Sequence, residues 1–195
     1  TAGSLFAAVE KGQAPAGLLL DIHIRDRFPK ERLAALTENL LKPSAEAERL
    51  IADRIAEYRE KGGNAEQGKK IYATNCAACH KFDGIGADIG PQLEGIGNRG
   101  IERMVEDIID PNRNIDVAFH YTIAVLKDGR VVTGLKRREV GQSVVFATIE
   151  GKEITIQKNE IERQAKSPAS IMPTGFGLAI PSPDFRNLLE YLLGG

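Results

Sequence analysis

The chain has 195 residues, of which 42% are hydrophobic and 27% are charged, and its formal net charge at pH 7 is −1. This length and composition allow a buried core in one or two domains. The near-zero charge and the dispersed basic residues exclude an electrostatic nucleic acid interface, and no apolar run approaches the roughly 18 residues of a membrane span.

Residues 1–62 are predicted to form helices that break at glycine and proline residues. Apolar residues recur at helical spacing within residues 33–41 and again within residues 50–58. Paired amphipathic helices of this kind are typical of the end of an α-solenoid. We expect this N-terminal segment to stop at Gly62-Gly63. Because the chain opens on Thr1 in helical sequence, we also expect it to be a mature or excised part of a longer protein.

The next predicted helix has Asn64 as its N-cap, with Gln67 three residues later as in a capping box, and it leads into the motif C-A-A-C-H at residues 76–80. In helical geometry Cys76, Cys79 and His80 emerge on one face. Each thiol can then add to one vinyl group of a haem, while the imidazole reaches the iron from the same side. The motif therefore predicts one haem c, attached through both cysteines and ligated by His80.

Three other interpretations of the two cysteines have weaker support. A redox dithiol is expected near a βαβ pattern, which is absent around these residues. A zinc site needs a second pair of ligands, but the other histidines are His23 and His120, and the sequence has no third cysteine. Two unmodified, buried cysteines beside a chance histidine are the third interpretation. Because covalent haem attachment implies export, we expect a periplasmic or otherwise exported protein.

A glycine-rich irregular loop is expected over residues 84–100, and it contains Gly90-Pro91-Gln92-Leu93. Residues 101–108 then carry one apolar stripe, which predicts a core-facing helix that ends before Pro111. Met104 lies on this stripe, so we expect it in the core and not on the iron.

Between about residues 115 and 165 the apolar residues alternate, which predicts a small antiparallel β unit. Two hairpins are expected, with turns at Asp128-Gly129 and Glu150-Gly151. Their predicted strands cover residues 121–127, 131–136, 144–149 and 153–156. Helical sequence resumes at the end of the chain, where Ser182 can cap the last helix and Pro183 can be its first residue.

The second axial position of the iron determines the function, because methionine, histidine or an open site would each give different chemistry. Met172 lies in an irregular segment before the last helix, where a flexible thioether can approach the iron, so we favour it. His120, at the entry to the first strand, is the stronger histidine alternative, and His23 belongs to an amphipathic segment outside the haem unit. Ligation by His80 and Met172 leaves no vacant site, which favours electron transfer over catalysis or gas binding.

With these motifs the chain resembles the class I cytochromes c. The residues that carry the resemblance are Gly68, Tyr72, Cys76, Cys79, His80, Gly90, Pro91, Leu93, Met172, Pro173, Leu189 and Tyr191, within residues 64–113 and 166–195. The resemblance implies that Gly68 and Tyr72 pack the first helix on the last, and that the Pro91 carbonyl accepts a hydrogen bond from His80. By the same analogy Arg99 pairs with a haem propionate; an ordinary solvated arginine is the alternative.

The chain departs from that family in one respect, since His80 and Met172 are 92 positions apart and a β unit lies between them. In this respect, and in the sequence D-P-N-R-N-I at residues 110–115, it resembles the haem-binding domain of large planctomycete and verrucomicrobial proteins, which follows helical repeats and a dehydrogenase-like propeller. We therefore expect an α+β fold that is mainly α. It would consist of an N-terminal helical segment at 1–62 and a cytochrome c domain at 63–195, with a β insertion at about 115–165.

These inferences predict a single-haem cytochrome domain that carries one electron at a time between a dehydrogenase-like donor, in the same polypeptide or docked to it, and a downstream acceptor. We expect an electron carrier and not an enzyme, alone or within a larger oxidoreductase. Two alternatives stay open. One is a haem enzyme or sensor with an open or exchangeable distal site, and the other is a docking or scaffold module in which the haem is structural.

Overall fold

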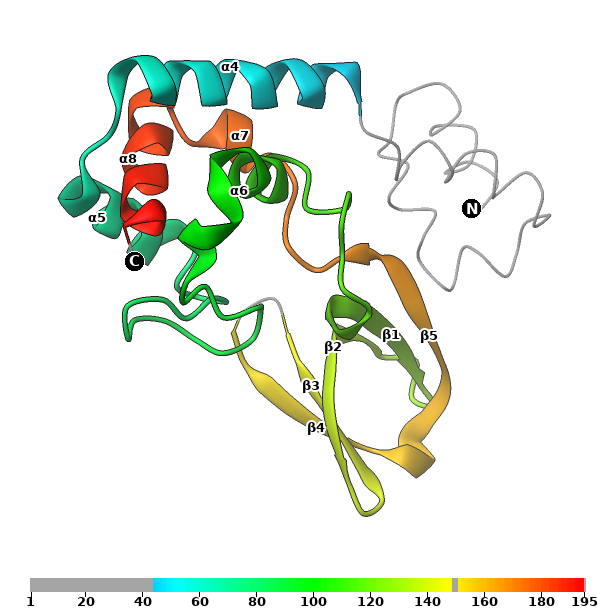
Figure 1. The fold of residues 1–195 in the computed structure, drawn as a ribbon. Coiled ribbons are helices and arrows are strands. Elements are labelled where there is room, and N and C mark those ends of the chain that lie inside the picture. Colours follow the sequence, from blue (N-terminus) through cyan, green and yellow to red (C-terminus); the bar gives the residue numbers. More distant parts are fainter. Residues whose placement is uncertain (1–43, 149–150, 195) are drawn as a thin grey trace.

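The computed structural model describes residues 44–148 and 151–194 (Figure 1). The helices predicted before Pro43, and His23 with them, lie outside the described residues. The α-helices are α4 (Ala45–Lys61), α5 (Ala65–Asn75), α6 (Gly100–Ile109), α7 (Phe176–Ala179) and α8 (Ser182–Leu193), and the 3-10 turns are η2 (Ile96–Arg99), η3 (Val117–Phe119) and η4 (Lys158–Glu160). The strands are β1 (His120–Leu126), β2 (Val131–Val140), β3 (Ser143–Ala147), β4 (Glu153–Gln157) and β5 (Ile161–Ser170). The α-helices lie together at one end of the described part and the strands at the other (Figure 1).

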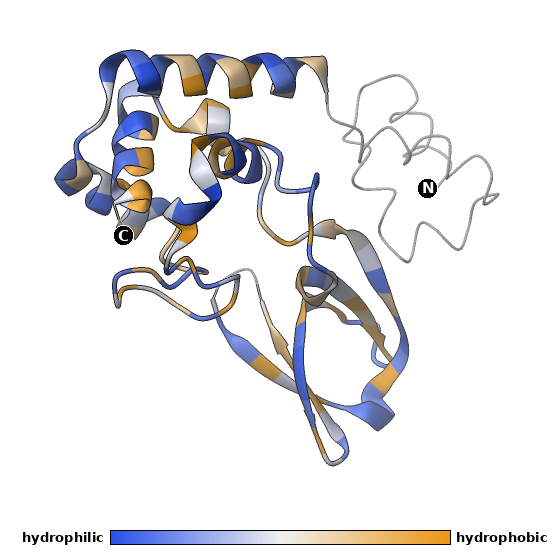
Figure 2. Ribbon diagram, in the orientation of Figure 1, coloured by the Kyte–Doolittle hydropathy of each residue, from blue (hydrophilic) through white to orange (hydrophobic). Residues whose placement is uncertain are grey.

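Helix α8 is the centre of the helical body, because α4, α5 and α6 all pack against it. Its fully buried side chains include Phe185, Leu188 and Leu189. The crossing with α5 is close, since a Cβ on Gly68 would lie 1.9 Å from the carbonyl oxygen of Asn187. Beside it the rings of Tyr72 and Tyr191 pack with their centroids 5.6 Å apart. Figure 2 shows hydrophobic and hydrophilic residues alternating along α4 and α8, as one-sided burial requires.

Helix α4 joins this body through both apolar and polar contacts. Ile51 belongs to the helical core, and the Arg54 guanidinium donates to the carbonyl oxygens of Gly177 at 2.7 Å and Ile180 at 3.3 Å. The helix ends before Gly62, whose φ of 61° favours glycine and whose N–H donates to the carbonyl of Tyr58. Helix α4 lies before residue 63 and packs on α6 and α8, which lie after that residue. The domain boundary at residue 63 stays a prediction. None of the described helices has the length and apolar character needed to cross a membrane.

The five strands form one antiparallel sheet in the order β4-β3-β2-β1-β5. The predicted turn at Asp128-Gly129 is confirmed, with Gly129 at a φ of 88° between β1 and β2. Strands β3 and β4 also lie where the second hairpin was expected. Their buried side chains and those of β1 and β2 form a separate core of Ala124, Leu126, Val132, Val144, Phe146 and Ile156. Helices and antiparallel sheet are thus both present, whereas the expected predominance of helix is not confirmed.

Strand β5 is absent from the sequence-based prediction, which ends the β unit near residue 165. The segment I-E-R-Q-A-K-S-P-A-S has few apolar residues and contains Pro168, so it shows little of the pattern of a strand. It forms a strand because it pairs with β1 at the edge of the sheet, where a proline is tolerated. As a result the sheet continues to Ser170, two residues before Met172.

The predicted N-caps have different outcomes. Asn64 caps α5, since its side chain accepts from the Gln67 N–H at 2.9 Å. The prediction for Ser182 is wrong by one residue, because α8 begins at Ser182 and its N-cap is Pro181. The Ser182 hydroxyl donates to the carboxylate of Glu57 on α4, which links the first turn of α8 to that helix.

An acid-dependent contribution to stability is expected in the sheet. Glu139 on β2 accepts hydrogen bonds from Lys136 and from Lys158 of η4, which lower its pKa from 4.5 to about 2. A carboxyl group with a depressed pKa stabilises the fold above its unfolded pKa, and this contribution is lost as the pH falls from 4.5 towards 2. Thermal midpoints of wild type and Glu139→Gln should therefore differ at neutral pH and converge over this interval, with Glu162→Gln on β5 as the control. A difference of the same size at both ends of the interval would contradict this origin.

Candidate haem-binding site

The C-x-x-C-H motif lies in a turn directly after α5 and not on the helix itself. Helix α5 ends at Asn75, and the carbonyl of Cys76 then accepts from the N–H groups of Cys79 at 3.1 Å and His80 at 2.9 Å. These bonds to the third and fourth following residues preserve the spacing of a helical turn. Neither thiol is in a disulfide. The local backbone thus keeps the helical spacing that the sequence argument requires, although the helix itself has ended.

His80 is held at its ring and at its backbone. Its Nδ1 lies 2.8 Å from the carbonyl oxygen of Pro91, and because a carbonyl can only accept, Nδ1 carries the proton and Nε2 keeps its lone pair. The Tyr72 hydroxyl donates to the His80 carbonyl at 2.5 Å. Burial lowers the pKa of His80, and the weaker effect of the Pro91 hydrogen bond raises it. A neutral imidazole with an available Nε2 is the form that ligates a metal.

The loop after the motif folds back over it, and two glycines make this possible. The N–H groups of Ile89 and Gly90 donate to the Cys79 carbonyl at 3.0 and 2.7 Å. A Cβ on Gly90 would lie 2.7 Å from Cε1 of His80, and one on Gly86 would lie 2.0 Å from the His80 carbonyl oxygen. The sequence indicates a glycine-rich loop, but it does not single out Gly86, whose close approach depends on the folded path of the chain.

The two cysteines lie against different apolar clusters. Cys76 packs on the helical core, and Cys79 packs on a cluster built around Ile89, Leu135 and Ala147, which joins the loop to the sheet. Burial raises the pKa of the Cys76 thiol to about 12 and also raises that of Cys79. Protonated thiols are poor redox nucleophiles, so this environment disfavours the redox dithiol interpretation.

The sheet contacts the motif and its loop directly. The Arg137 guanidinium on β2 donates to the carbonyl oxygens of Asp88 at 2.8 Å and Ile89 at 3.3 Å. Across the β3–β4 connection, a Cβ on Gly151 would lie 3.0 Å from the carbonyl oxygen of Ala78, inside the motif. One end of the β unit is therefore packed on the haem-attachment turn and its loop.

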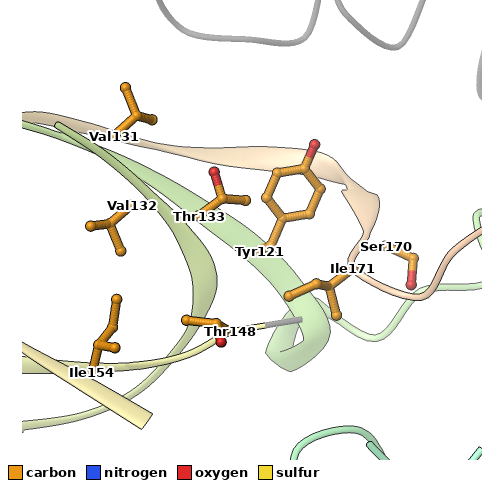
Figure 3. Close-up of a pocket in the computed structure, with 8 residues that line it drawn as sticks. All are labelled: Tyr121, Val131, Val132, Thr133, Thr148, Ile154, Ser170 and Ile171. Atoms are coloured by element: carbon orange, nitrogen blue, oxygen red, sulfur yellow. The ribbon is translucent and has the colours of Figure 1, made fainter. Parts of the chain in front are cut away.

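The segment with Met172 leaves the sheet beside the same region. Ser170 ends β5 opposite His120, and Ile171 packs in the cluster that contains Cys79. A pocket of about 510 Å³ opens on the sheet here, with Ser170 and Ile171 at one end of its lining (Figure 3). Its other lining residues are Tyr121, Val131, Val132, Thr133, Thr148 and Ile154, so it contains no motif residue. Met172 itself is half-buried, and its N–H donates to the Ser170 hydroxyl at 3.1 Å.

The other two candidate residues have partners within the helical body. Met104 is 3% exposed and belongs to the helical core, as its place on the apolar stripe predicts. Arg99 forms an ion pair with Asp107 of α6, with 3.1 Å between Nη1 and Oδ2. Pairing of Arg99 with a haem propionate would require it to share or exchange this carboxylate, and it stays a prediction.

The chemistry of these residues fits a haem c. The turn brings together two thiols that can form thioether bonds and an imidazole with an available Nε2. The close contact of Gly90 with the imidazole ring and the Pro91 hydrogen bond fix the orientation of that ring. Apolar clusters lie against both cysteines, which gives a bound haem the low-polarity surroundings that tune its potential.

Comparison with known families agrees with this geometry. Residues 65–140 match the family model described as Cytochrome c. The matched range begins in α5, contains the C-x-x-C-H turn and Pro91, and ends with β2, whereas Met172 lies beyond it. Motif, geometry and match together support a c-type cytochrome, which binds haem c covalently and has an electron-transfer role. No curated protein matches the chain.

Proposed function

We propose that residues 63–195 are a single-haem c-type cytochrome domain whose iron is ligated by His80 and Met172. When bound, the haem supplies a one-electron couple between ferric and ferrous iron. The observation that carries the proposal is the 2.8 Å contact between His80 Nδ1 and the Pro91 carbonyl, immediately after a turn that holds both cysteines. This contact orients the imidazole and increases its donor strength towards a metal.

Met172 is the proposed distal ligand because its segment connects the sheet to the helical body beside Cys79. A thioether raises the potential of a haem compared with a second imidazole, and it occupies the remaining coordination site. A six-coordinate iron suits a carrier of electrons, and not an enzyme or a gas sensor. His120 is the alternative ligand, and its pairing with Ser170 supports testing it, because that pair lies two residues from Met172.

We further propose that the donor is a dehydrogenase-like protein or domain, that the acceptor is another redox protein, and that transfer occurs in the periplasm or another exported compartment. The likeness to the planctomycete type of haem-binding domain and the need for covalent haem attachment outside the cytoplasm support this. The β unit would shield one side of the haem, a role supported by the contacts of Arg137 with the loop and of Leu135 with the apolar cluster at Cys79.

Visible spectroscopy of the ferric holoprotein tests the ligand assignment. The wild type should show the weak long-wavelength band that methionine coordination gives, Met172→Ala should lose it, and His120→Ala should keep it. The reduced wild type should bind carbon monoxide slowly, because the gas must displace a ligand, whereas reduced Met172→Ala should bind it at once. A wild type without the band, together with an unchanged spectrum in Met172→Ala, would overturn the assignment, and rapid carbon monoxide binding by the wild type would favour an open site.

A further inference from the structure

The turn after α6 is fixed to two helices by one arginine. The Arg113 guanidinium contacts the carboxylates of Glu106 at 2.7 Å, Asp110 at 3.1 Å and Glu48 of α4 at 2.6 Å. Its side chain is only 17% exposed, so these charge-assisted bonds are partly shielded from water. The neighbouring residue, Asn112, is therefore presented from a rigid position.

Asn112 uses that position to reach the end of the sheet. Its Oδ1 accepts a hydrogen bond from the N–H of Ser170 at 2.9 Å, across 58 positions of the sequence. Both residues are half-buried. Ser170 pairs with His120 at the end of β5, and the pairing of β5 with β1 changes register between this pair and the next one, Thr122 with Lys166. The side chain of Asn112 thus supplies an acceptor to the strand where the regular ladder is interrupted.

Ser170 connects the contact with Asn112 to the backbone of Met172. Its hydroxyl oxygen accepts from the N–H of Met172 at 3.1 Å, which closes a tight turn over Ile171. Ile171 in turn packs against the cluster that contains Cys79. The three-residue segment is therefore held by hydrogen bonds on the side of α6 and by apolar contact on the side of the haem-attachment turn.

We propose that Asn112 is a positioning residue, which holds Ser170 and through it the backbone of Met172 in the place from which the thioether ligates the iron. This inference rests on the proposed function, because it concerns the delivery of the distal ligand. Loss of the Asn112 acceptor leaves a half-buried N–H without this partner and loosens the segment. An external ligand that competes with Met172 for the iron then binds more tightly, because the loosened segment holds the thioether less firmly in place.

Titration of the ferric holoprotein with imidazole measures this competition. Asn112→Ala should bind imidazole about tenfold more tightly than the wild type, which corresponds to about 1.4 kcal/mol. Asn112→Asp keeps a carboxylate oxygen as acceptor and should recover most of the wild-type affinity. The matched control is Asn114→Ala, which changes the same turn but removes only a 3.3 Å contact with Glu106, and its affinity should stay within about twofold of the wild type.

Ser170→Ala is the second variant, since it removes the acceptor of the Met172 N–H without altering the turn after α6. It should tighten imidazole binding in the same direction, which keeps the test available if Asn112→Ala matures poorly. Equal affinities in Asn112→Ala and Asn114→Ala, or an unchanged affinity in Ser170→Ala, would overturn the inference. If the wild type itself lacks the methionine band, the proposed ligation fails first, so the two failures are distinguishable.

Discussion

Replacing Gly86 by alanine should destabilise the holoprotein by about 3 kcal/mol or more, whereas Gly84→Ala should cost only about 1 kcal/mol. Both glycines lie in the loop after the haem motif, and both have a positive φ, 103° at Gly86 and 71° at Gly84. Both substitutions therefore force alanine into an unfavourable backbone conformation. They differ in their surroundings. A Cβ on Gly86 would lie 2.0 Å from the His80 carbonyl oxygen and 2.9 Å from that of Ala77, but a Cβ on Gly84 would have no atom within 4 Å.

The clash at Gly86 should also affect the iron, because the displaced carbonyl belongs to His80. Chemical denaturation of the two holoproteins gives the free energies of unfolding, and their visible spectra report the ligand field. We expect a reduced yield of holoprotein and an altered spectrum for Gly86→Ala, with Gly84→Ala close to the wild type in both. Similar stabilities and spectra for the two variants would show that the loop does not press on the motif as described.

The parts of this site that were predictable from sequence are those whose chemistry is local. Two thiols and an imidazole within five consecutive residues indicate haem attachment without any knowledge of the fold. The cap at Asn64 and the turn at Asp128-Gly129 are likewise short patterns, and both occur in the structure. The Pro91 carbonyl was expected from family resemblance alone, because nothing local indicates that a proline eleven residues later faces the His80 ring.

The parts that were missed depend on partners far away in the sequence. Strand β5 forms because β1 offers it an edge, and its own residues carry a weak strand pattern. Ser182 fits a helix cap in isolation, but α8 begins one residue earlier than predicted, and the Ser182 hydroxyl donates to Glu57 on α4. In the sequence Asn112 is only one member of the segment D-P-N-R-N-I, and its hydrogen bond with Ser170 joins residues 58 positions apart. The C-x-x-C-H turn is therefore visible in a local pattern, whereas the contacts around Met172 depend on the folded chain.

Helix α4 is a further case in which the sequence predicts an element but not its contacts. Its amphipathic pattern predicts a helix and does not show what that helix stabilises. Arg54→Ala should lower the free energy of unfolding by about 3 kcal/mol, because it removes a buried charged donor from two backbone carbonyls. Those carbonyls belong to Gly177 and Ile180, which lie between Met172 and α8. The guanidinium also lies 5.3 Å from the ring centroid of Phe185, in the centre of the helical core.

Arg59→Ala is the control on the same helix, because its side chain is 61% exposed and pairs with Glu102 at the surface. A surface ion pair of this kind contributes at most about 1 kcal/mol, so this loss should be small. Arg54→Lys keeps the charge but has no planar fork to reach both carbonyls, and its stability should fall between those of wild type and Arg54→Ala. Urea denaturation of the four holoproteins measures the order. If Arg54→Ala were no less stable than Arg59→Ala, α4 would contribute only surface contacts. The expected order would instead show that α4 stabilises, through Arg54, the residues between Met172 and α8.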